Sequence, residues 1–351
     1  MIRVLRTTEG RIWHALLRSI ENFDFYHTAD YHALEERREG GQAELVIYGE
    51  GSRLIAVPLM LREIPRALQG AGEGTLYDAR SVYGYIGLLS SRQTDGEMVE
   101  RFGAAFYRYL SARNVVSVFG RMHPLLDSLN RGPGIGIVEP VGNTVAVPLH
   151  EGLEAYERRL SKSHRYEIRR LRELGCGIRH DRELAYLGEF TRMYTETMKR
   201  LGAKPHYFYT EDELREMFSS KQFGAQLHVA IQDGVACAMA IIVRCGELLQ
   251  YHLSCSRDGV ARYPATKLLL DSVCRDAISA GVKWFHLGGG VGGRQDSLFA
   301  FKLGFGGVVF PFKTWRYIVR ARDYERLSLA SRADNSAEAG EFFPHYRHES
   351  P

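Results

Sequence analysis

The chain has 351 residues, of which 45% are hydrophobic and 25% charged, and its formal net charge is +4. This length allows two globular domains, and the balanced composition excludes a disordered or fibrous chain. The mild basicity is compatible with a polyanionic partner without identifying one. The five cysteines form no CxxC pair, and most lie in apolar runs. We therefore expect buried free thiols in a reducing cytoplasm and no structural zinc site.

No segment has the length and hydrophobicity of a membrane span. The longest apolar run, residues 235–243, is far shorter than the ~18 residues that a spanning helix needs. The first 23 residues carry charges throughout and lack the apolar core of a signal peptide. We expect a cytoplasmic monomer with no membrane span and no DNA partner.

Two windows of the chain share one pattern, a β-rich run, a polar turn with glycine and a longer apolar run. They are residues 45–62 and 227–244, and each predicts a hairpin. A further β-like stretch, a helix and a strand follow each window, at residues 82–90, 95–113 and 115–120, and at 248–255, 265–280 and 282–287. Two hairpins can look alike by chance, but matched element order over ~75 residues favours a duplication. The fold class predicted is α+β.

The repeat sets the expected domain boundaries. We place one unit at residues 1–146 and a second at 147–325. Residues 326–351, rich in Ser, Ala, Glu and Arg, are expected to form a mobile tail, in which Phe342–Tyr346 could dock onto the fold.

A helix expected at residues 154–174 opens the second unit and carries a basic stripe. The stripe contains Arg158, Lys162, Arg165, Arg169 and Arg172. Such a stripe can bind phosphates through charge and forked hydrogen bonds. The alternative is the solvated face of an amphipathic helix. His164 falls on the apolar side and is predicted to be a packed histidine.

A second candidate binding segment is Thr197–Tyr209, which mixes cations with aromatic side chains. It could clamp a phosphorylated or sugar-bearing substrate, with Arg200 and Tyr207 as its contacts. The alternative is a helix connection in which Tyr207 packs against the fold.

Polar aromatic residues also lie in the middle of two expected strands. They are Tyr251 and His252 in the second unit, and Tyr83 and Tyr85 in the first. Because side chains alternate along a strand, one of Tyr251 and His252 faces away from the core. His252 is either a general base or a structural histidine. No Ser-His-Asp, paired-carboxylate or HExxH arrangement stands out, and the Walker pattern is absent. The glycine run at residues 288–293 does not open the long helix that a dinucleotide site needs.

The densest signal is the stretch His286–Gly307, which predicts a strand, a glycine loop and a short helix, with another strand from Val308. Clustered glycines indicate tight turns or a close approach to the backbone. The stretch contains a single lysine, Lys302. This makes it a plausible place to hold a ligand.

These residues resemble the Fem family of peptidoglycan bridge-forming aminoacyltransferases and the GNAT-fold acyltransferases related to them. The most specific piece is Trp284-Phe-His-Leu-Gly-Gly-Gly290 followed by Asp296–Gly307 with its Phe-Lys-x-Gly-Phe-Gly motif. Weaker matches lie at residues 83–87, 121–125, 163–172 and 197–200, so the resemblance covers roughly residues 25–320.

The resemblance implies two GNAT-like units facing each other, and aminoacyl-tRNA as a co-substrate with no bound cofactor. It implies that Lys302 stabilises an oxyanion and that Phe301 shapes a tunnel. Gly288 and Gly289 would let the terminal adenosine of the tRNA approach the backbone. Phosphates of the acceptor or the tRNA would be held by Arg165, Arg169 and Arg200.

One departure from ordinary GNAT enzymes concerns the acyl donor. Those enzymes carry an R/Q-x-x-G-x-G/A turn whose backbone amides hold the coenzyme A pyrophosphate. The corresponding segment here, Arg257–Lys267, has Gly259 as its only glycine and Pro264 near the helix entry. This weakens acyl-CoA as donor and favours aminoacyl-tRNA. The sequence contains no long heptad segment for the coiled-coil arm of some Fem members.

The function expected is aminoacyl transfer to a free amine, with formation of a peptide bond. The acceptor would be a peptidoglycan precursor, or a peptide or nucleoside natural-product intermediate. One alternative is an N-acyltransferase that uses acyl-CoA or acyl-carrier protein, and another is a non-catalytic binding protein.

Overall fold

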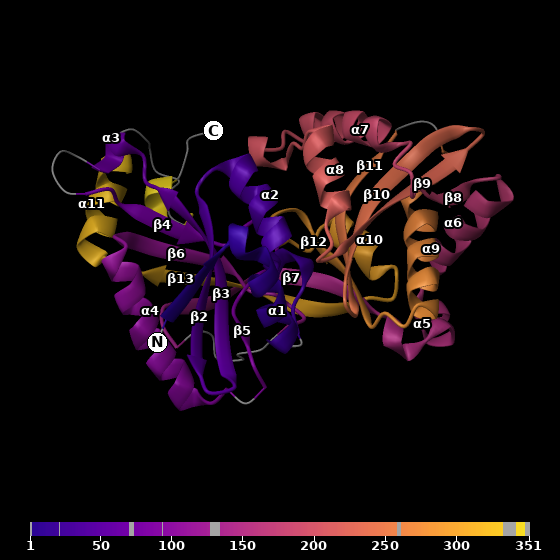
Figure 1. The fold of residues 1–351 in the computed structure, drawn as a ribbon. Coiled ribbons are helices and arrows are strands. Elements are labelled where there is room, and N and C mark those ends of the chain that lie inside the picture. Colours follow the sequence, from indigo (N-terminus) through magenta and orange to yellow (C-terminus); the bar gives the residue numbers. More distant parts are fainter. Residues whose placement is uncertain are drawn as a thin grey trace. The chain divides into compact units, whose positions relative to one another are not determined.

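The computed structural model describes residues 2–20, 22–69, 74–92, 94–126, 134–257, 261–332 and 342–347. These residues form two compact units (Figure 1). The first combines residues 1–141 with 312–351, and the second comprises residues 142–311. Both mix helices with a mostly antiparallel sheet, so the predicted α+β class is confirmed.

The first unit is a sheet with helices on both faces. Its strand order is β1-β2-β3-β4-β6-β13, with β5 paired to β3. The elements are β1 (Ile2–Arg6), α1 (Gly10–Ile20), α2 (Ala29–Glu39), β2 (Gln42–Glu50), β3 (Arg53–Glu63), α3 (Arg66–Gln69), β4 (Tyr77–Arg80), β5 (Leu89–Ser90), α4 (Gly96–Ala112), β6 (Val115–Arg121) and α11 (Ala321–Arg332).

Alternation along β2 explains how both faces of this sheet are covered. Leu45 and Ile47 belong to a cluster with α1, whereas Val46 and Tyr48 belong to a cluster with α4. Successive side chains of a strand point to opposite faces, so a nearly continuous apolar run fills two cores.

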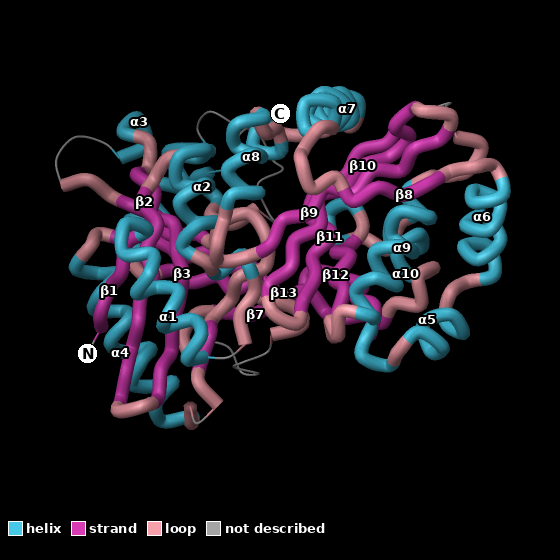
Figure 2. Tube along the Cα trace, turned by 45° about the vertical axis from the view of Figure 1, so that its right-hand side comes forward, coloured by secondary structure: helices cyan, strands magenta, loops and turns pink. Residues whose placement is uncertain are grey.

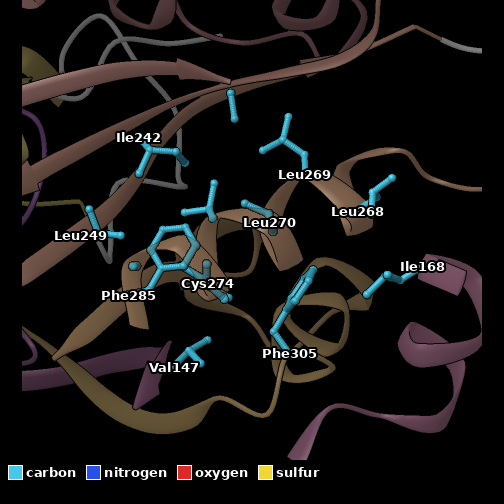
Figure 3. Close-up of a cluster of buried hydrophobic side chains, with 14 of the residues drawn as sticks. Val147, Ile168, Ile242, Leu249, Leu268, Leu269, Leu270, Cys274, Phe285 and Phe305 are labelled. Atoms are coloured by element: carbon cyan, nitrogen blue, oxygen red, sulfur yellow. The ribbon is translucent and has the colours of Figure 1, made fainter. Parts of the chain in front are cut away.

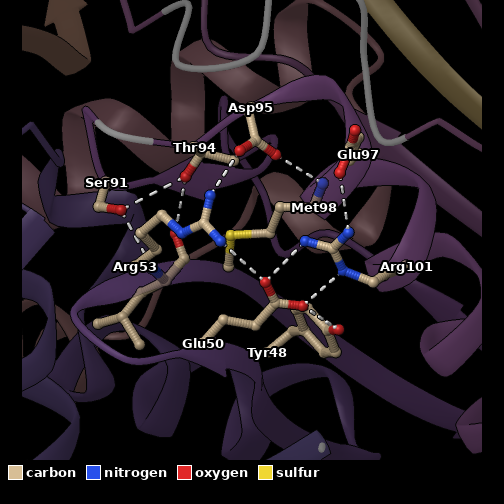
Figure 4. Close-up of polar contacts among 10 residues, drawn as sticks. Tyr48, Glu50, Arg53, Ser91, Thr94, Asp95, Glu97, Met98 and Arg101 are labelled. Atoms are coloured by element: carbon tan, nitrogen blue, oxygen red, sulfur yellow. Dashed lines mark hydrogen bonds and ion pairs between the residues drawn. The ribbon is translucent and has the colours of Figure 1, made fainter.

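Polar contacts fix the start of α4 against the hairpin of β2 and β3 (Figure 4). Asp95 caps α4 by accepting a hydrogen bond from the backbone of Met98, at 2.8 Å. Arg53 pairs with both Glu50 and Asp95. Hydrogen bonds from Arg101 and Tyr48 hold the pKa of Glu50 at about 2.

The second unit repeats this topology. Its strand order is β7-β12-β11-β10-β9-β8. Figure 2 lets the reader follow the elements of each unit by type. The elements are α5 (Leu153–Arg159), α6 (Lys162–Glu173), β8 (Gly177–His180), α7 (Leu187–Arg200), α8 (Glu211–Ser219), β9 (Gly224–Gln232), β10 (Val235–Cys245), β11 (Leu248–Ser256), α9 (Thr266–Ser279), β12 (Trp284–Gly289) and α10 (Ser297–Leu303).

The core of the second unit lies between its sheet and the helices α5, α6, α9 and α10. Figure 3 shows Leu269 and Leu270 of α9 near Ile242 and Phe285 of the sheet, with Phe305 after α10 nearby. This core fixes α10 on the sheet, which matters because α10 carries Lys302.

The predicted repeat is confirmed. In each unit an antiparallel hairpin is followed by a strand, a helix and a strand that pairs in parallel with the one before the helix. The parallel pairs are β4 with β6 and β11 with β12.

The last strand of each sheet comes from an unexpected part of the chain. β7 (Ile137–Pro148) follows β6 in sequence, but its residues Thr144–Pro148 pair with β12 in the second unit. β13 (Val308–Ile318) follows α10, but Thr314–Ile318 pair with β6 in the first unit. The expected second unit at residues 147–325 therefore extends too far, because residues 312–325 belong to the first unit.

Three further expectations need correction. Of the strand expected at 82–90 only Leu89–Ser90 forms, since Gly84 and Gly87 adopt positive φ values of 117° and 67°. The helix expected at 154–174 is two helices, because Leu160 and Ser161 adopt extended ψ values of 127° and 152°.

The tail that was expected to be mobile is partly folded. Leu327 of α11 is fully buried, and Tyr346 bonds to Ser117 at 2.7 Å. Residues 333–341 and 348–351 of the tail lie outside the described residues.

Strand β13, which pairs with β6, should be essential to the stability of the first unit. Trp315 is 1% exposed, and its indole donates to the Ile135 carbonyl oxygen at 2.8 Å. Trp315→Ala should therefore lower the free energy of unfolding by about 3–5 kcal/mol. Ile318→Ala on the same strand is the matched control, because Ile318 is 44% exposed. Urea unfolding followed by circular dichroism measures both, and equal losses would contradict the assignment.

Candidate active site

The candidate site begins where two parallel strands stop pairing. β11 and β12 pair over Leu248–Gln250 and Trp284–His286, although β11 continues to Ser256 and β12 to Gly289. At the last pair, His286 Nδ1 lies 2.7 Å from Gln250 Oε1. Beyond this bond the backbone of Leu287–Gly289 runs on without β11 as its partner. A ligand can use backbone groups that a neighbouring strand leaves unpaired.

Lys302 lies against this segment. Its Nζ donates to the carbonyl oxygen of Gly289 at 2.6 Å, and the residue is only 7% exposed. Burial lowers the pKa of Lys302 to about 8, while the carboxylate of Asp296 partly opposes the shift. An ammonium group carries three donor hydrogens. Within the described part of the chain only one of these hydrogens is donated, to Gly289, and the other two are left for a ligand.

Asp296 holds the glycine loop and α10 together. One carboxylate oxygen accepts from the Phe299 backbone and the other from the Val291 backbone, each at 2.9 Å. These bonds lower the pKa of Asp296. Gly290 packs so closely on this carboxylate that any side chain at Gly290 would overlap it. The N-terminus of α10 is therefore fixed to the loop that precedes it.

Most glycines of the stretch make room for other parts of the protein. A Cβ on Gly289 would lie 2.7 Å from the Asn143 carbonyl oxygen in β7. One on Gly307 would overlap Val145, and one on Gly304 would overlap the imidazole of His164. At Gly292, by contrast, a Cβ would meet no atom within 4 Å. Close internal packing therefore explains most of the glycine density.

Phe301, the predicted partner of Lys302, lies between α6 and the core. Its ring is 5.4 Å from that of Phe305 and 5.6 Å from that of His164. Its carbonyl oxygen bonds to His164 Nε2 at 2.9 Å. Whether Phe301 shapes a tunnel stays a prediction.

The predicted basic stripe is largely engaged within the protein. Arg165 donates to the carbonyl oxygens of Glu157 and Leu160, at 2.9 and 3.1 Å. Ion pairs join Arg158 with Glu154, Arg169 with Glu173 and Arg172 with Asp271. The pairs of Arg158 and Arg169 are exposed and easily broken, so phosphate binding by Arg165 and Arg169 stays a prediction.

Helix α7 and the segment after it offer three cations that are less engaged. Arg192, Lys199 and Lys204 are exposed, and none makes an ion pair with another described residue. Arg200 is exposed at the end of α7. Tyr207 is half-buried, with its ring 4.2 Å from that of His206.

Tyr251 and His252 lie at an irregularity in β11. Ile241 pairs with Leu253 and Ile242 with Tyr251, so His252 is the extra residue of a β-bulge. Bulges redirect side chains and are frequent beside active sites. The hydroxyl of Tyr251 donates to Ser254 Oγ at 2.6 Å, and burial raises the pKa of Tyr251 to about 12. His252 is buried, with its ring 6.4 Å from that of Tyr209.

The two tyrosines predicted in the first unit occupy the irregular segment before β5. Tyr85 packs edge-on against Phe312, with ring centroids 5.2 Å apart. The carbonyl oxygen of Tyr83 accepts from the Tyr31 hydroxyl at 3.1 Å. Both residues are half-buried. Their contact with a substrate stays a prediction.

Sequence reasoning missed three contacts of α6 and α10. These are the clamp by Asp296, the bond from His164 to Phe301, and the ion pair between Glu167 and Lys267 at 2.8 Å. The N-capping position of Asp296 before a short helix was the one readable signal.

The segment that corresponds to the donor turn is described at Arg257 and from Ala261 onward. Gly259 falls outside the described residues. Pro264 directly precedes α9, whose N-cap is Ala265 and makes no side-chain cap hydrogen bond.

The described residues contain neither a metal-binding cluster nor a membrane-spanning helix. Across the described ranges, no three His, Cys, Asp or Glu side chains gather so that they could hold a metal ion. No helix in the same ranges is long and apolar enough to cross a membrane.

Comparisons with known proteins agree with this architecture. A family model for an acetyltransferase (GNAT) domain matches residues 158–301. The crystal structure of FemX is similar at 12% identity with a TM-score of 0.70, over 93% of this chain and 99% of FemX. A search of curated proteins gave no significant match.

Two further solved structures are similar. The C-terminal domain of a putative lysylphosphatidylglycerol synthetase from Agrobacterium fabrum has 14% identity and a TM-score of 0.56, over 93% of this chain and 96% of that domain. L-PGS from Bacillus licheniformis has 15% identity and a TM-score of 0.51, over 82% of this chain and 90% of that structure.

At these identities the likeness to solved structures concerns the fold. The fold is a Fem-like tandem of GNAT units, and the resemblance predicted from the sequence is confirmed. The chain thus has the GNAT fold.

The depressed pKa of Lys302 can be tested without a substrate. Trace acetylation with acetic anhydride, followed by mass spectrometry of peptides, reports the neutral fraction of each amine as the pH is varied. Lys302 should reach half of its limiting rate near pH 8, because burial disfavours the cation. The exposed Lys199 serves as the internal reference. A midpoint above pH 10 would refute the buried environment.

Proposed function

We propose that this protein transfers an aminoacyl group from aminoacyl-tRNA to a free amine and so forms a peptide bond. The acceptor would be a peptidoglycan precursor or a peptide or nucleoside natural-product intermediate. One observation carries the proposal. Lys302 is a buried amine bonded to the end of β12, with donor hydrogens left over where β11 no longer pairs. Buried donors without partners are costly, and they persist where a ligand uses them.

The proposed chemistry needs charge stabilisation and orientation. The acceptor amine attacks the ester carbonyl carbon, which places negative charge on the carbonyl oxygen. The ammonium of Lys302 would donate hydrogen bonds to that oxygen in a water-poor site. The intermediate then collapses. The C–N bond remains, the C–O bond to the ribose breaks, and the proton lost by the amine goes to the ribose oxygen.

The surface charge supports a polyanionic donor. Arg192, Lys199 and Lys204 lie on or just after α7 and make no ion pair with other described residues. They are therefore better placed to meet phosphates than the basic residues of α5 and α6, three of which form ion pairs within the protein. The similar fold of FemX agrees with the resemblance to the Fem family, which implies aminoacyl-tRNA as the donor.

The second candidate is an N-acyltransferase that uses acyl-CoA or acyl-carrier protein. The match of residues 158–301 to an acetyltransferase domain favours it. The proline before α9 argues against a full pyrophosphate cradle, because proline offers no backbone N–H.

The proposal carries further expectations about the setting of the reaction. An aminoacyl-tRNA donor implies work in the cytoplasm, with which the five buried free thiols are compatible. We propose that the protein acts as a monomer and without a bound cofactor.

Replacing Lys302 tests the mechanism. Lys302→Ala should lower kcat about 100- to 1000-fold, the range seen when one oxyanion donor is removed. The assay uses labelled aminoacyl-tRNA or acyl-CoA with a panel of amines. Lys283→Ala is the control, because Lys283 is an exposed lysine in an ion pair with Glu247. Transfer from CoA that survives ribonuclease would overturn the tRNA donor, and an unchanged rate for Lys302→Ala would remove Lys302 from the mechanism.

The pH dependence gives a second test. With a pKa of about 8, Lys302 is a cation below pH 8 and loses its charge above it. The wild-type rate should therefore fall as the pH rises through about 8. Arginine stays charged at all these pH values. Lys302→Arg, even with a reduced rate, should lack this falling limb in a kcat against pH profile. If the limb persists, it belongs to another group.

A further inference from the structure

The helix that carries Lys302 has an unusual C-terminal end. α10 contains seven residues, and the carbonyl oxygens of its last turn need partners from outside the helical pattern. Ala300 O accepts from the Gly304 backbone, and Lys302 O from the Phe305 backbone, at 3.1 and 3.2 Å. The oxygen of Phe301 accepts instead from His164 Nε2, at 2.9 Å. A side chain from α6 thus completes the helix beside the proposed catalytic lysine.

The hydrogen bonds of His164 specify one tautomer. Ser161 Oγ accepts from the His164 backbone at 3.1 Å and lies 3.0 Å from His164 Nδ1. The serine hydroxyl therefore donates to Nδ1, and Nε2 carries the proton that it donates to Phe301. Ser161 also donates its backbone N–H to the Gly304 carbonyl oxygen at 2.9 Å. The start of α6 thus holds two carbonyl groups, one on each side of Lys302 in sequence, those of Phe301 and Gly304.

The imidazole is also locked by packing. Its ring meets that of Phe305 edge-on, with centroids 4.7 Å apart at 89°. A side chain on Gly304 would overlap the imidazole. The φ of Gly304 is −57°, which any residue can adopt, so the backbone does not require glycine here. The imidazole itself explains the lack of a side chain at Gly304.

We propose that His164 is a positioning residue that fixes α10, and with it Lys302 Nζ, at the reacting carbonyl group. The role rests on the proposed function of Lys302, since His164 acts only through that lysine. The contacts of His164 are with Ser161, the backbone of α10 and the rings of Phe301 and Phe305.

The electrostatic surroundings suit this role. Burial and the cation of Lys267 lower the pKa of His164, while the bond to Phe301 and the carboxylate of Glu167 oppose the shift. Glu167 on α6 and Lys267 on α9 pair with each other at 2.8 Å. A neutral imidazole fixes α10 without adding a charge near Lys302.

The central test is His164→Phe, which keeps a ring in place and removes the donor. A displacement of about 1 Å can cost up to about 100-fold in rate, so kcat should fall about 10- to 100-fold with KM within about twofold. Lys302 should gain access to water, so its labelling midpoint should rise above pH 8 and the falling limb of the pH profile should move with it. His164→Gln, whose amide N–H can reach the same carbonyl oxygen, should recover most of kcat.

A matched control separates this role from general stability. His150 Nδ1 also lies 3.1 Å from a backbone carbonyl oxygen, that of Lys283, and its ring packs on Trp284. His150→Phe removes the same kind of bond away from α10 and should leave kcat and the labelling midpoint unchanged. If His164→Phe fails to fold, Gly304→Ala carries the test, because its added methyl group displaces the imidazole from Phe301.

The labelling midpoint of Lys302 and kcat together distinguish a wrong positioning role for His164 from a wrong proposed function. Labelling of Lys302 requires no turnover. An unchanged midpoint and an unchanged kcat per folded molecule in His164→Phe would overturn the positioning role. A wild-type protein without aminoacyl transfer, but with a midpoint that shifts in His164→Phe, would overturn the function alone.

Discussion

The hydrogen bond from Lys302 to the Gly289 carbonyl oxygen is the contact around which the second unit is arranged. It brings one cation into a site that excludes most water, at the end of a strand whose neighbour has stopped pairing. Burying an amine disfavours its charge, so the surrounding residues must fix it tightly for the position to be kept. Asp296 fixes the N-terminal side of α10 and His164 its C-terminal side. The core of α9 and β12 supports both.

The glycine cluster has a different meaning once its neighbours are known. In sequence it indicates close approach to the backbone, and a ligand is the natural candidate. In the structure, Gly289 approaches Asn143, Gly290 approaches Asp296 and Gly304 approaches His164. The glycines therefore let the loop, α10 and β7 lie close together. They contribute to the site indirectly, by allowing the backbone around Lys302 to be compact.

Periodicity and turn chemistry predicted the hairpins, α4, α9, α10 and the α+β repeat, because these depend on local patterns. Local patterns could not show that β7 and β13 each complete the sheet of the other unit, since pairing partners are set by contacts distant in sequence. The residues of the candidate site also differ in this respect, since a local motif indicates some of them and only contacts distant in sequence reveal others. The motif predicts a role for Lys302, and the helical pattern predicts that His164 is packed. Its bond to Phe301 spans 137 residues, and no sequence period reports it. The bulge that makes His252 an extra residue in β11 was equally hidden, because alternation alone predicts a regular strand.

The exchange of final strands has a consequence for how the chain can be made. The first unit begins at the N-terminus, yet its sheet includes Thr314–Ile318. During synthesis this unit lacks an edge strand until nearly the whole chain has left the ribosome, whereas domains in general fold as they emerge. The second unit receives β7 first, but the partner of β7 is β12, the last strand of that sheet to be synthesised. The half of the protein that is synthesised first is therefore the half that can be completed last.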